Sequence, residues 1–181
     1  SAAFDWTGQE RGLSVSWSDT LKNHKTTFLI VYTLLLTGVF ALLVVYRPMV
    51  VSGSSMYPTF QDNDRIIVDT FNGDISQLNR GDVIVFFSPE AESRLMVKRI
   101  IGMPGDNICI LEGHVYLNGV LLKESYTNNG ESSHETIPSF RVPENGVFVL
   151  GDNRLVSADS REWGAIDKSR IYGRIIHRFE P

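Results

Sequence analysis

The sequence predicts a mainly β domain preceded by one membrane-spanning helix. Residues 26–46 contain no charged side chain, and as a helix they would measure about 30 Å, the thickness of the hydrocarbon layer of a bilayer. After this span, apolar residues come in short runs rich in β-branched and aromatic side chains, separated by turn-forming residues. Helical periodicity is scarce there. We therefore expect residues 49–181 to form a mainly β domain.

The polar and mixed-charge residues 1–25 predict an N-terminal leader on the cytoplasmic side of the membrane. The basic residues nearest the span are Arg11, Lys22 and Lys25 before it, and Arg47 and Arg65 after it. This small excess favours a cytoplasmic N-terminus by the positive-inside rule. A cleaved signal peptide is the main alternative, but its apolar core is usually shorter and ends in small residues, whereas this one ends at Tyr46.

Six runs after the span predict strands, with turn signals between them. They are residues 65–69, 83–87, 94–102, 107–111, 147–150 and 171–179. Residues 114–117 and 120–122 flank Asn118-Gly119, a pair that strongly favours a two-residue hairpin turn. One helical turn is expected near residues 166–170, and the polar residues 123–138 are expected to form a long loop.

The charge pattern argues against binding to nucleic acid. The chain has 21 acidic and 17 basic residues, which leave a net charge of −4. The basic residues are scattered singly or in pairs, whereas a phosphate backbone requires a clustered basic stripe. We therefore expect no nucleic-acid partner.

Ser55 is the candidate nucleophile, because it lies in a short segment that can hold one shape. Gly53 tolerates backbone angles that are closed to other residues, and the ring of Pro58 fixes its own φ. A serine hydroxyl also needs a neighbouring base, most often histidine. The four histidines are poorly placed, since they lie before the span, in a hairpin strand, in the polar loop and in the last strand. A Ser/His/Asp site is left open.

Lys98 is the alternative base. Strand alternation in residues 94–102 places it on one face with Met96 and Ile100. An amine on an apolar face loses hydration, which disfavours its charged form and lowers its pKa. A solvated charge at a strand end, whose stem covers apolar surface, would give the same sequence. Residues 151–164 form a third polar segment, and their Asp, Asn and Arg side chains predict a loop stiffened by its own hydrogen bonds.

Four stretches, taken in order, resemble the motifs of bacterial type I signal peptidases. They are residues 52–59 (SGSSMYPT), 80–86 (RGDVIVF), 98–106 (KRIIGMPGD) and 151–164 (GDNRLVSADSREWG). The apolar span occupies the position of the family's membrane anchor, so the resemblance covers the chain from about residue 26 to its end. Any one motif would be weak, whereas four in this order are highly specific.

The resemblance implies a Ser/Lys endopeptidase, anchored by one span with its catalytic domain on the extracytoplasmic face of the cytoplasmic membrane. By motif position, it implies Ser55 as nucleophile, Lys98 as general base and Ser157 as the hydroxyl that orients the lysine amine. It also implies two antiparallel β-sheets, similar to the self-cleaving repressors of the SOS response, and no metal or cofactor. The partners it implies are preprotein signal peptides, the phospholipid membrane and, nearby, the protein export machinery.

Further roles are implied by the same resemblance. Cleavage is expected after an Ala-X-Ala type site, because a shallow apolar pocket accepts only small side chains, and Met56, Val51 and Met96 are expected to bind the substrate. The backbone of residues 49–54 would pair with the substrate as an added strand. The residues expected to form ion pairs that hold the loop bearing Ser157 are Asp152, Asp159, Arg99 and Arg161.

Gly53 departs from part of the family. Some members carry serine two residues before the nucleophile and use its hydroxyl in the oxyanion hole. Here the hole is expected to rely on the Ser55 amide, with a second backbone donor or a water. Loss of one oxyanion donor costs about 3 kcal/mol of transition-state stabilisation, so an unreplaced donor would slow the enzyme.

Two other functions are left open by the sequence. A non-catalytic relative that assists pilus or surface assembly would share the fold, although such relatives can lack the serine or the lysine that are present here. A self-cleaving regulator would use the same Ser/Lys chemistry, but it is expected to carry a DNA-binding module in place of the membrane span.

Overall fold

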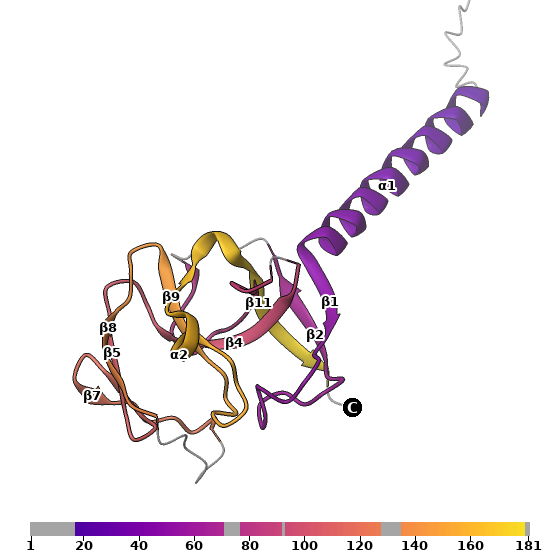
Figure 1. The fold of residues 1–181 in the computed structure, drawn as a ribbon. Coiled ribbons are helices and arrows are strands. Elements are labelled where there is room, and N and C mark those ends of the chain that lie inside the picture. The colour runs from indigo at the N-terminus through magenta and orange to yellow at the C-terminus, as the bar shows by residue number, and fades with distance from the viewer. Residues whose placement is uncertain (1–16, 71–76, 92, 128–134, 180–181) are drawn as a thin grey trace, which may run out of the picture. The chain divides into compact units, whose positions relative to one another are not determined.

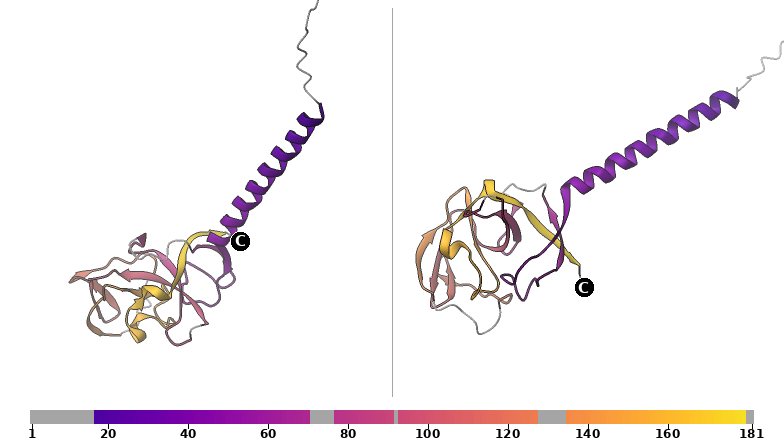
Figure 2. Two further views of the ribbon diagram at one scale, coloured as in Figure 1. Left: turned by 90° about the horizontal axis from the view of Figure 1, so that it is seen from above. Right: turned by 45° about the vertical axis from the view of Figure 1, so that its right-hand side comes forward.

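A computed structural model describes residues 17–70, 77–91, 93–127 and 135–179. The chain divides into two compact units, Ser1–Leu42 and Leu43–Pro181. In the first unit the described residues belong to one helix, and the second unit is built mainly of strands (Figure 1, Figure 2).

The helix α1 (Trp17–Val45) contains the predicted span. Its segment His24–Val45 has a mean hydropathy of 2.7 and is long and apolar enough to cross a membrane. The Thr33 hydroxyl is satisfied within the helix, because it donates to the carbonyls of Leu29 (2.9 Å) and Ile30 (2.8 Å). The helix begins at Trp17, before residue 26, because polar residues continue a helix readily and hydropathy marks only its apolar part.

The larger sheet has seven strands, and every neighbouring pair in it is antiparallel. Its order is β1-β2-β11-β3-β4-β9-β10. The strands are β1 (Tyr46–Val50), β2 (Arg65–Asp69), β3 (Val83–Phe87), β4 (Leu95–Gly102), β9 (Gly146–Leu150), β10 (Ile166–Asp167) and β11 (Ile171–Phe179).

The smaller sheet has four antiparallel strands in the order β7-β6-β5-β8. They are β5 (Asn107–Leu111), β6 (His114–Leu117), β7 (Val120–Leu121) and β8 (Ile137–Arg141). Asn118 and Gly119 join β6 to β7 with φ values of 50° and 82°, the left-handed backbone that the predicted hairpin turn requires. The prediction of a mainly β fold with two antiparallel sheets is confirmed.

Three strands were not predicted: the two-residue β10, which lies where a helical turn was expected, and β1 and β8, each of which carries a proline. Pro48 lies in β1 and Pro138 in β8, and both strands lie at the edge of their sheet. An edge strand accepts proline because one row of its backbone groups has no ladder partner. The prediction of a loop over residues 123–138 was therefore wrong at its end, where β8 begins at Ile137, and Tyr46 belongs to β1.

The strand β9 connects the two sheets through its side chains. Val147 and Val149 pack in one hydrophobic cluster with Ile84 of β3, while Phe148 and Leu150 pack in another with Ile108 of β5. All five residues of β9 are buried. The loop after β9 therefore begins at the end of a strand whose side chains pack in both hydrophobic clusters.

Short helices flank β10. The helix α2 (Ser160–Trp163) begins after Asp159, whose side chain accepts from the Arg161 N–H, and it ends at Gly164 with φ 77°. This turn of helix within residues 151–164 was not predicted. The 3-10 helix η2 (Lys168–Arg170) is the helical turn expected near residues 166–170.

Candidate functional site

The structure brings Ser55 and Lys98 into direct contact. The Lys98 Nζ donates a 2.8 Å hydrogen bond to the Ser55 Oγ, although the two residues are far apart in the sequence. Lys98 lies in β4 opposite Ile84 of β3, and it is only 2% exposed. Its neighbours on alternate positions, Met96 and Ile100, both pack in the hydrophobic cluster that contains Ile84.

The environment of Lys98 lowers its pKa from 10.5 to about 8. Burial is the largest cause, because it removes water from the charged amine. The carboxylates of Asp159 and Asp152 oppose this shift, whereas the positive charges of Arg94 and Arg161 add to it. A substantial fraction of the amine is thus neutral at mildly alkaline pH, and only the neutral form can accept a proton.

Backbone contacts hold the turn that carries Ser55. The Asn153 N–H donates to the Ser55 carbonyl at 3.0 Å, and the Asn153 Nδ2 donates to the Ser54 carbonyl at 3.2 Å. Gly53 has φ +94°, a conformation that disfavours other residues, and its N–H donates to Asp62 Oδ1 at 2.7 Å. The loop after β9 therefore helps to fix the position of Ser55 relative to Lys98 of β4.

Arg99 and Asp152 form a buried pair beside this turn. The guanidinium donates from Nε to Asp152 Oδ1 at 2.8 Å and from Nη2 to Asp152 Oδ2 at 2.6 Å. Thr59, four residues after Ser55, donates from its hydroxyl to the same carboxylate. Arg99 also donates to the Gly81 carbonyl at 2.7 Å. This arrangement ties the segment after Ser55 to the start of the loop formed by residues 151–164.

A second pair holds the far part of the same loop. The Arg161 Nε lies 2.8 Å from Asp159 Oδ1, and Asp159 Oδ2 accepts from the Gly151 N–H at 3.0 Å. Arg161 also donates from Nη2 to the Ser157 carbonyl at 2.9 Å. The Ser157 carbonyl is thereby held by Arg161, which is itself held by Asp159.

The Ser157 side chain is buried and lies against Gly151. Its hydroxyl makes one long contact of 3.5 Å, to the Ala158 carbonyl. A hydrogen bond from Ser157 to the Lys98 amine is not among the contacts of the described residues. The orienting role of Ser157 stays a prediction.

Glu124 and Tyr126, in the polar segment before β8, support the site and were missed from the sequence. Glu124 accepts two hydrogen bonds from Arg154, at 2.9 and 2.5 Å, and Arg154 donates from Nε to the Gly151 carbonyl at 3.0 Å. The Tyr126 ring lies 4.2 Å from the Arg99 Cζ, a cation–π contact. The sequence offered only a weak signal for these two roles, namely one acidic and one aromatic side chain near the start of the polar segment 123–138.

We expect Glu124→Gln to destabilise the catalytic domain by about 3 kcal/mol, because Arg154 is buried, the Glu124 side chain is only 10% exposed, and Arg154 would keep an uncompensated charge. Activity should fall as well, since Arg154 holds the Gly151 carbonyl. Thermal unfolding of the full chain in detergent measures the first effect. Glu112→Gln, at an exposed position, is the matched control, and equal melting temperatures for the two variants would refute the prediction.

A cleft of about 140 Å³ opens directly beside the Ser55–Lys98 contact. Its wall is mostly apolar, and it includes the three residues expected to bind substrate: Met56, Val51 and Met96. Met56 is almost fully buried at 1% exposure. The remaining lining residues are Met49, Val50, Ser52, Ser55, Ile66, Val85, Arg94, Leu95, Val97 and Lys98.

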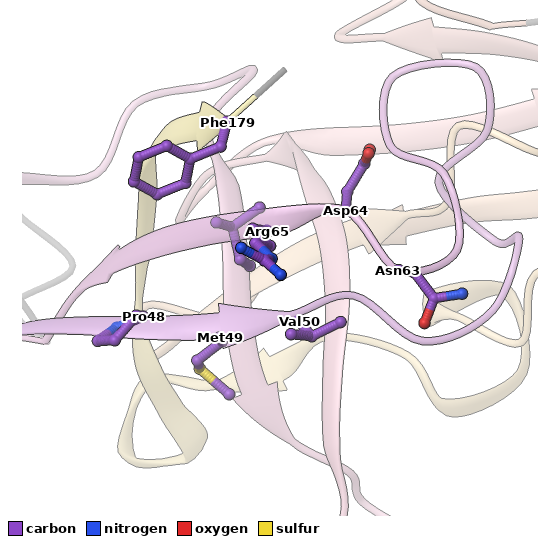
Figure 3. Close-up of a pocket in the computed structure, with 8 residues that line it drawn as sticks. Pro48, Met49, Val50, Asn63, Asp64, Arg65 and Phe179 are labelled. Carbon is purple, nitrogen blue, oxygen red and sulfur yellow. The ribbon is translucent and has the colours of Figure 1, made fainter. Parts of the chain in front are cut away.

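A larger hollow of about 810 Å³ lies over β1 and β2 and contains no catalytic candidate. Figure 3 shows Pro48, Met49 and Val50 on one side of it and Phe179 of β11 on another. It shares Met49, Val50 and Ile66 with the smaller cleft. The smaller cleft is the candidate active site, because it contains the paired hydroxyl and amine.

The family described as "Signal peptidase, peptidase S26" matches residues 24–179. A relative from Bacillus caldolyticus, named "Signal peptidase I", is 36% identical over 77% of this chain and 82% of its own length. A relative from Synechocystis sp., named "Probable signal peptidase I-2", is 38% identical over 72% of this chain, which spans 62% of that relative's length.

Among solved structures, a signal peptidase I from Enterococcus faecalis matches 57% of this chain and all of its own, with 32% identity and a TM-score of 0.49. The family match over most of the chain, together with the identity to the Bacillus relative, is sufficient to assign the family. The chain belongs to the signal peptidase family, peptidase S26, whose members are serine endopeptidases, as its motifs predicted.

Proposed function

We propose that this chain removes N-terminal signal peptides from exported preproteins and cuts after an Ala-X-Ala type site. Ser55 acts as the nucleophile and Lys98 as the general base. The observation that carries the proposal is the 2.8 Å contact between the Ser55 Oγ and the Nζ of a buried lysine whose pKa is lowered to about 8. Removal of signal peptides is the activity for which the relatives are named.

The chemistry requires the contact between the two side chains to reverse its direction. When Lys98 is neutral, its lone pair accepts the Ser55 proton while the Oγ attacks the carbonyl carbon of the residue before the cut. The same amine then delivers that proton to the leaving nitrogen of the mature protein. A water next enters, gives a proton to Lys98 and releases the signal peptide from the Oγ. Lys98 thus accepts and returns one proton in each half of the reaction.

The Ser55 N–H is our candidate for the oxyanion donor. Among the described residues no acceptor is found for it, whereas the Gly53 N–H is already bonded to Asp62. Gly53 supplies no hydroxyl, so the second donor is not a side chain at that position. Ser157 would act as a positioning residue, provided that its hydroxyl rotates from the Ala158 carbonyl towards the Lys98 amine.

The substrate backbone would add as a strand along the cleft. Residues 95–98 of β4 pair with β3, whereas β9 joins β4 only from Arg99 onwards, so one edge of this part of β4 is open. Residues 49–52 and the buried Met56 line the same cleft. The wall of this cleft, which has a volume of about 140 Å³, is mostly apolar, and this would favour apolar side chains in the residues before the cut.

We also propose that α1 anchors the chain in the cytoplasmic membrane as a single span, with residues 49–181 on the extracytoplasmic face. The apolar segment His24–Val45 has the required length and composition. Residues 1–25 would then face the cytoplasm, near the protein export machinery. Labelling of single cysteines on either side of the span with a membrane-impermeant thiol reagent tests this orientation.

The cleavage rate is expected to rise with pH and to reach half of its plateau near pH 8. The protonated lysine is inactive, so activity is lost as the pH falls below the pKa of Lys98 and is retained above it. The measurement is kcat/KM against pH for a peptide substrate that has no titrating side chain. A midpoint near pH 10 would contradict a desolvated lysine.

The function itself is tested with the full chain in detergent and a preprotein that carries an Ala-X-Ala site. Mass spectrometry should find one cut, after the second alanine, and Ser55→Ala should give none. If the folded wild type does not cut, the chain is better explained as a non-catalytic assembly protein. A cut within the chain itself, lost in Ser55→Ala, would instead indicate a self-cleaving regulator.

A further inference from the structure

Arg94 lies at the mouth of the cleft, immediately before β4. It is exposed, and it lines the same cleft as Ser55 and Lys98. Its backbone is fixed on both sides, because its N–H donates to the Ala91 carbonyl at 2.9 Å and its carbonyl accepts from the Ser88 N–H at 2.8 Å. No ion pair neutralises Arg94 within the described part of the chain. Its charge is therefore presented to whatever occupies the cleft.

Among the described residues that line the cleft, Arg94 is the one permanent charge. The other described lining residues are apolar or hydroxyl-bearing, apart from Lys98, which is neutral in the reactive state. The field of Arg94 reaches the reacting groups, since its positive charge is one cause of the lowered pKa of Lys98. A substrate side chain that lies nearer to Arg94 than the Lys98 amine does would experience a stronger field from Arg94 than that amine experiences.

The strand geometry indicates which substrate residue that is. Arg94 precedes Lys98 by four residues, which is about 13 Å along a strand. An extended substrate bound along the open edge of β4 has the same rise per residue. With the residue before the cut placed at Ser55 and Lys98, and with the substrate running parallel to β4, the side chain near Arg94 belongs to a residue about four positions before the cut.

We propose that Arg94 is a specificity-determining residue that disfavours a cationic substrate side chain, and favours an acidic one, about four residues before the cut. The proposal rests on the proposed function and adds to it a charge preference upstream of the Ala-X-Ala site. The substrates it favours are signal peptides with an acidic or neutral residue in that position. Those with lysine or arginine there are expected to be cut slowly.

The test uses the full chain in detergent and three preproteins that differ only in carrying Glu, Gln or Lys at the fourth residue before the cut. For the wild type, kcat/KM with Glu should exceed that with Lys by about 5- to 10-fold. In Arg94→Gln the ratio should approach one, and in Arg94→Glu it should invert. High salt should reduce the wild-type ratio, because the site is exposed to solvent.

Arg141→Gln is the matched control, since Arg141 is an exposed arginine on β8 of the smaller sheet. It should keep the wild-type ratio. A Glu-to-Lys ratio that is the same in wild type, Arg94→Gln and Arg94→Glu would overturn the proposal, even though cleavage continues. Failure of the proposed function has a different signature, because then the Gln substrate is not cut by any variant.

Discussion

Replacing Lys98 with methionine is expected to abolish cleavage and, at neutral pH, to make the folded chain more stable. Methionine fills most of the space of the buried lysine but cannot accept the Ser55 proton. Removal of a general base that works as a unit with its nucleophile costs about 10⁴-fold or more in kcat. Single-turnover cleavage of a preprotein by the full chain in detergent measures this loss.

The gain in stability follows from the lowered pKa of Lys98, which falls from 10.5 to about 8 on folding. Between these pH values the unfolded chain binds more protons than the folded one, so wild-type stability rises with pH across this window. Below pH 8 the folded chain carries the full penalty of the buried charge, about 3 kcal/mol. The advantage of Lys98→Met is therefore largest at pH 7, and it disappears as the pH rises from 8 to 10.5.

Melting temperatures of wild type and Lys98→Met, recorded by circular dichroism from pH 7 to pH 10.5, test the sign of this effect. Lys168→Met is the control, because Lys168 is exposed. A lower melting temperature for Lys98→Met at pH 7 would mean that the amine is stabilised by its partners. A variant that kept more than a few per cent of the activity would refute the role of Lys98 as base.

Replacing Gly151 with alanine is expected to have the second largest effect. The added Cβ would lie 2.6 Å from the Ser55 carbonyl oxygen and would also overlap the Ser157 side chain. A backbone oxygen cannot move aside as a flexible side chain can. Either the turn that carries Ser55 or the start of the loop formed by residues 151–164 must therefore shift. A misplacement of 1 Å costs about 100-fold in rate, and overpacking costs about 3 kcal/mol in stability.

The double variant Gly151→Ala, Ser157→Gly separates the two contacts. It removes the Ser157 Cβ and hydroxyl but leaves the Ser55 carbonyl in place, so activity should stay well below that of Ser157→Gly alone. Gly38→Ala is the control substitution, since an added Cβ there meets no atom within 4 Å. Full activity of Gly151→Ala would show that the loop and the serine turn are not in the close contact described.

The sequence predicted the strands that have unbroken apolar runs, and it missed those that depend on their place in the sheet. Val83–Phe87 and Asn107–Leu111 were predicted with the bounds that the structure has, because their β-branched and aromatic residues have no other favourable arrangement. The strands containing Pro48 and Pro138 were missed, since proline is tolerated only at an edge and edges cannot be identified from local sequence.

For the candidate site, the order of the motifs identified Ser55 and Lys98, the two partners of the central contact, but not the residues that support them. Ser55 and Lys98 were expected together because of the family resemblance. Local sequence could not connect Glu124 with Arg154, or Tyr126 with Arg99, because those contacts join segments that only the packing of the smaller sheet brings together. Ser157 shows the converse case, where the motif predicted a hydrogen bond that the described contacts do not include.

The position of β9 in two hydrophobic clusters has a consequence for how the domain opens. Its side chains alternate between the two hydrophobic clusters, one of which includes Ile84 of the larger sheet and the other Ile108 of the smaller sheet. Separating the two sheets would therefore expose apolar surface that β9 now covers. The amides of both sheets should therefore exchange with solvent in one cooperative event rather than in two. The site loop begins where β9 ends, so the Ser55–Lys98 contact and the whole domain would be lost together, and partly opened molecules with an intact protease site should be rare.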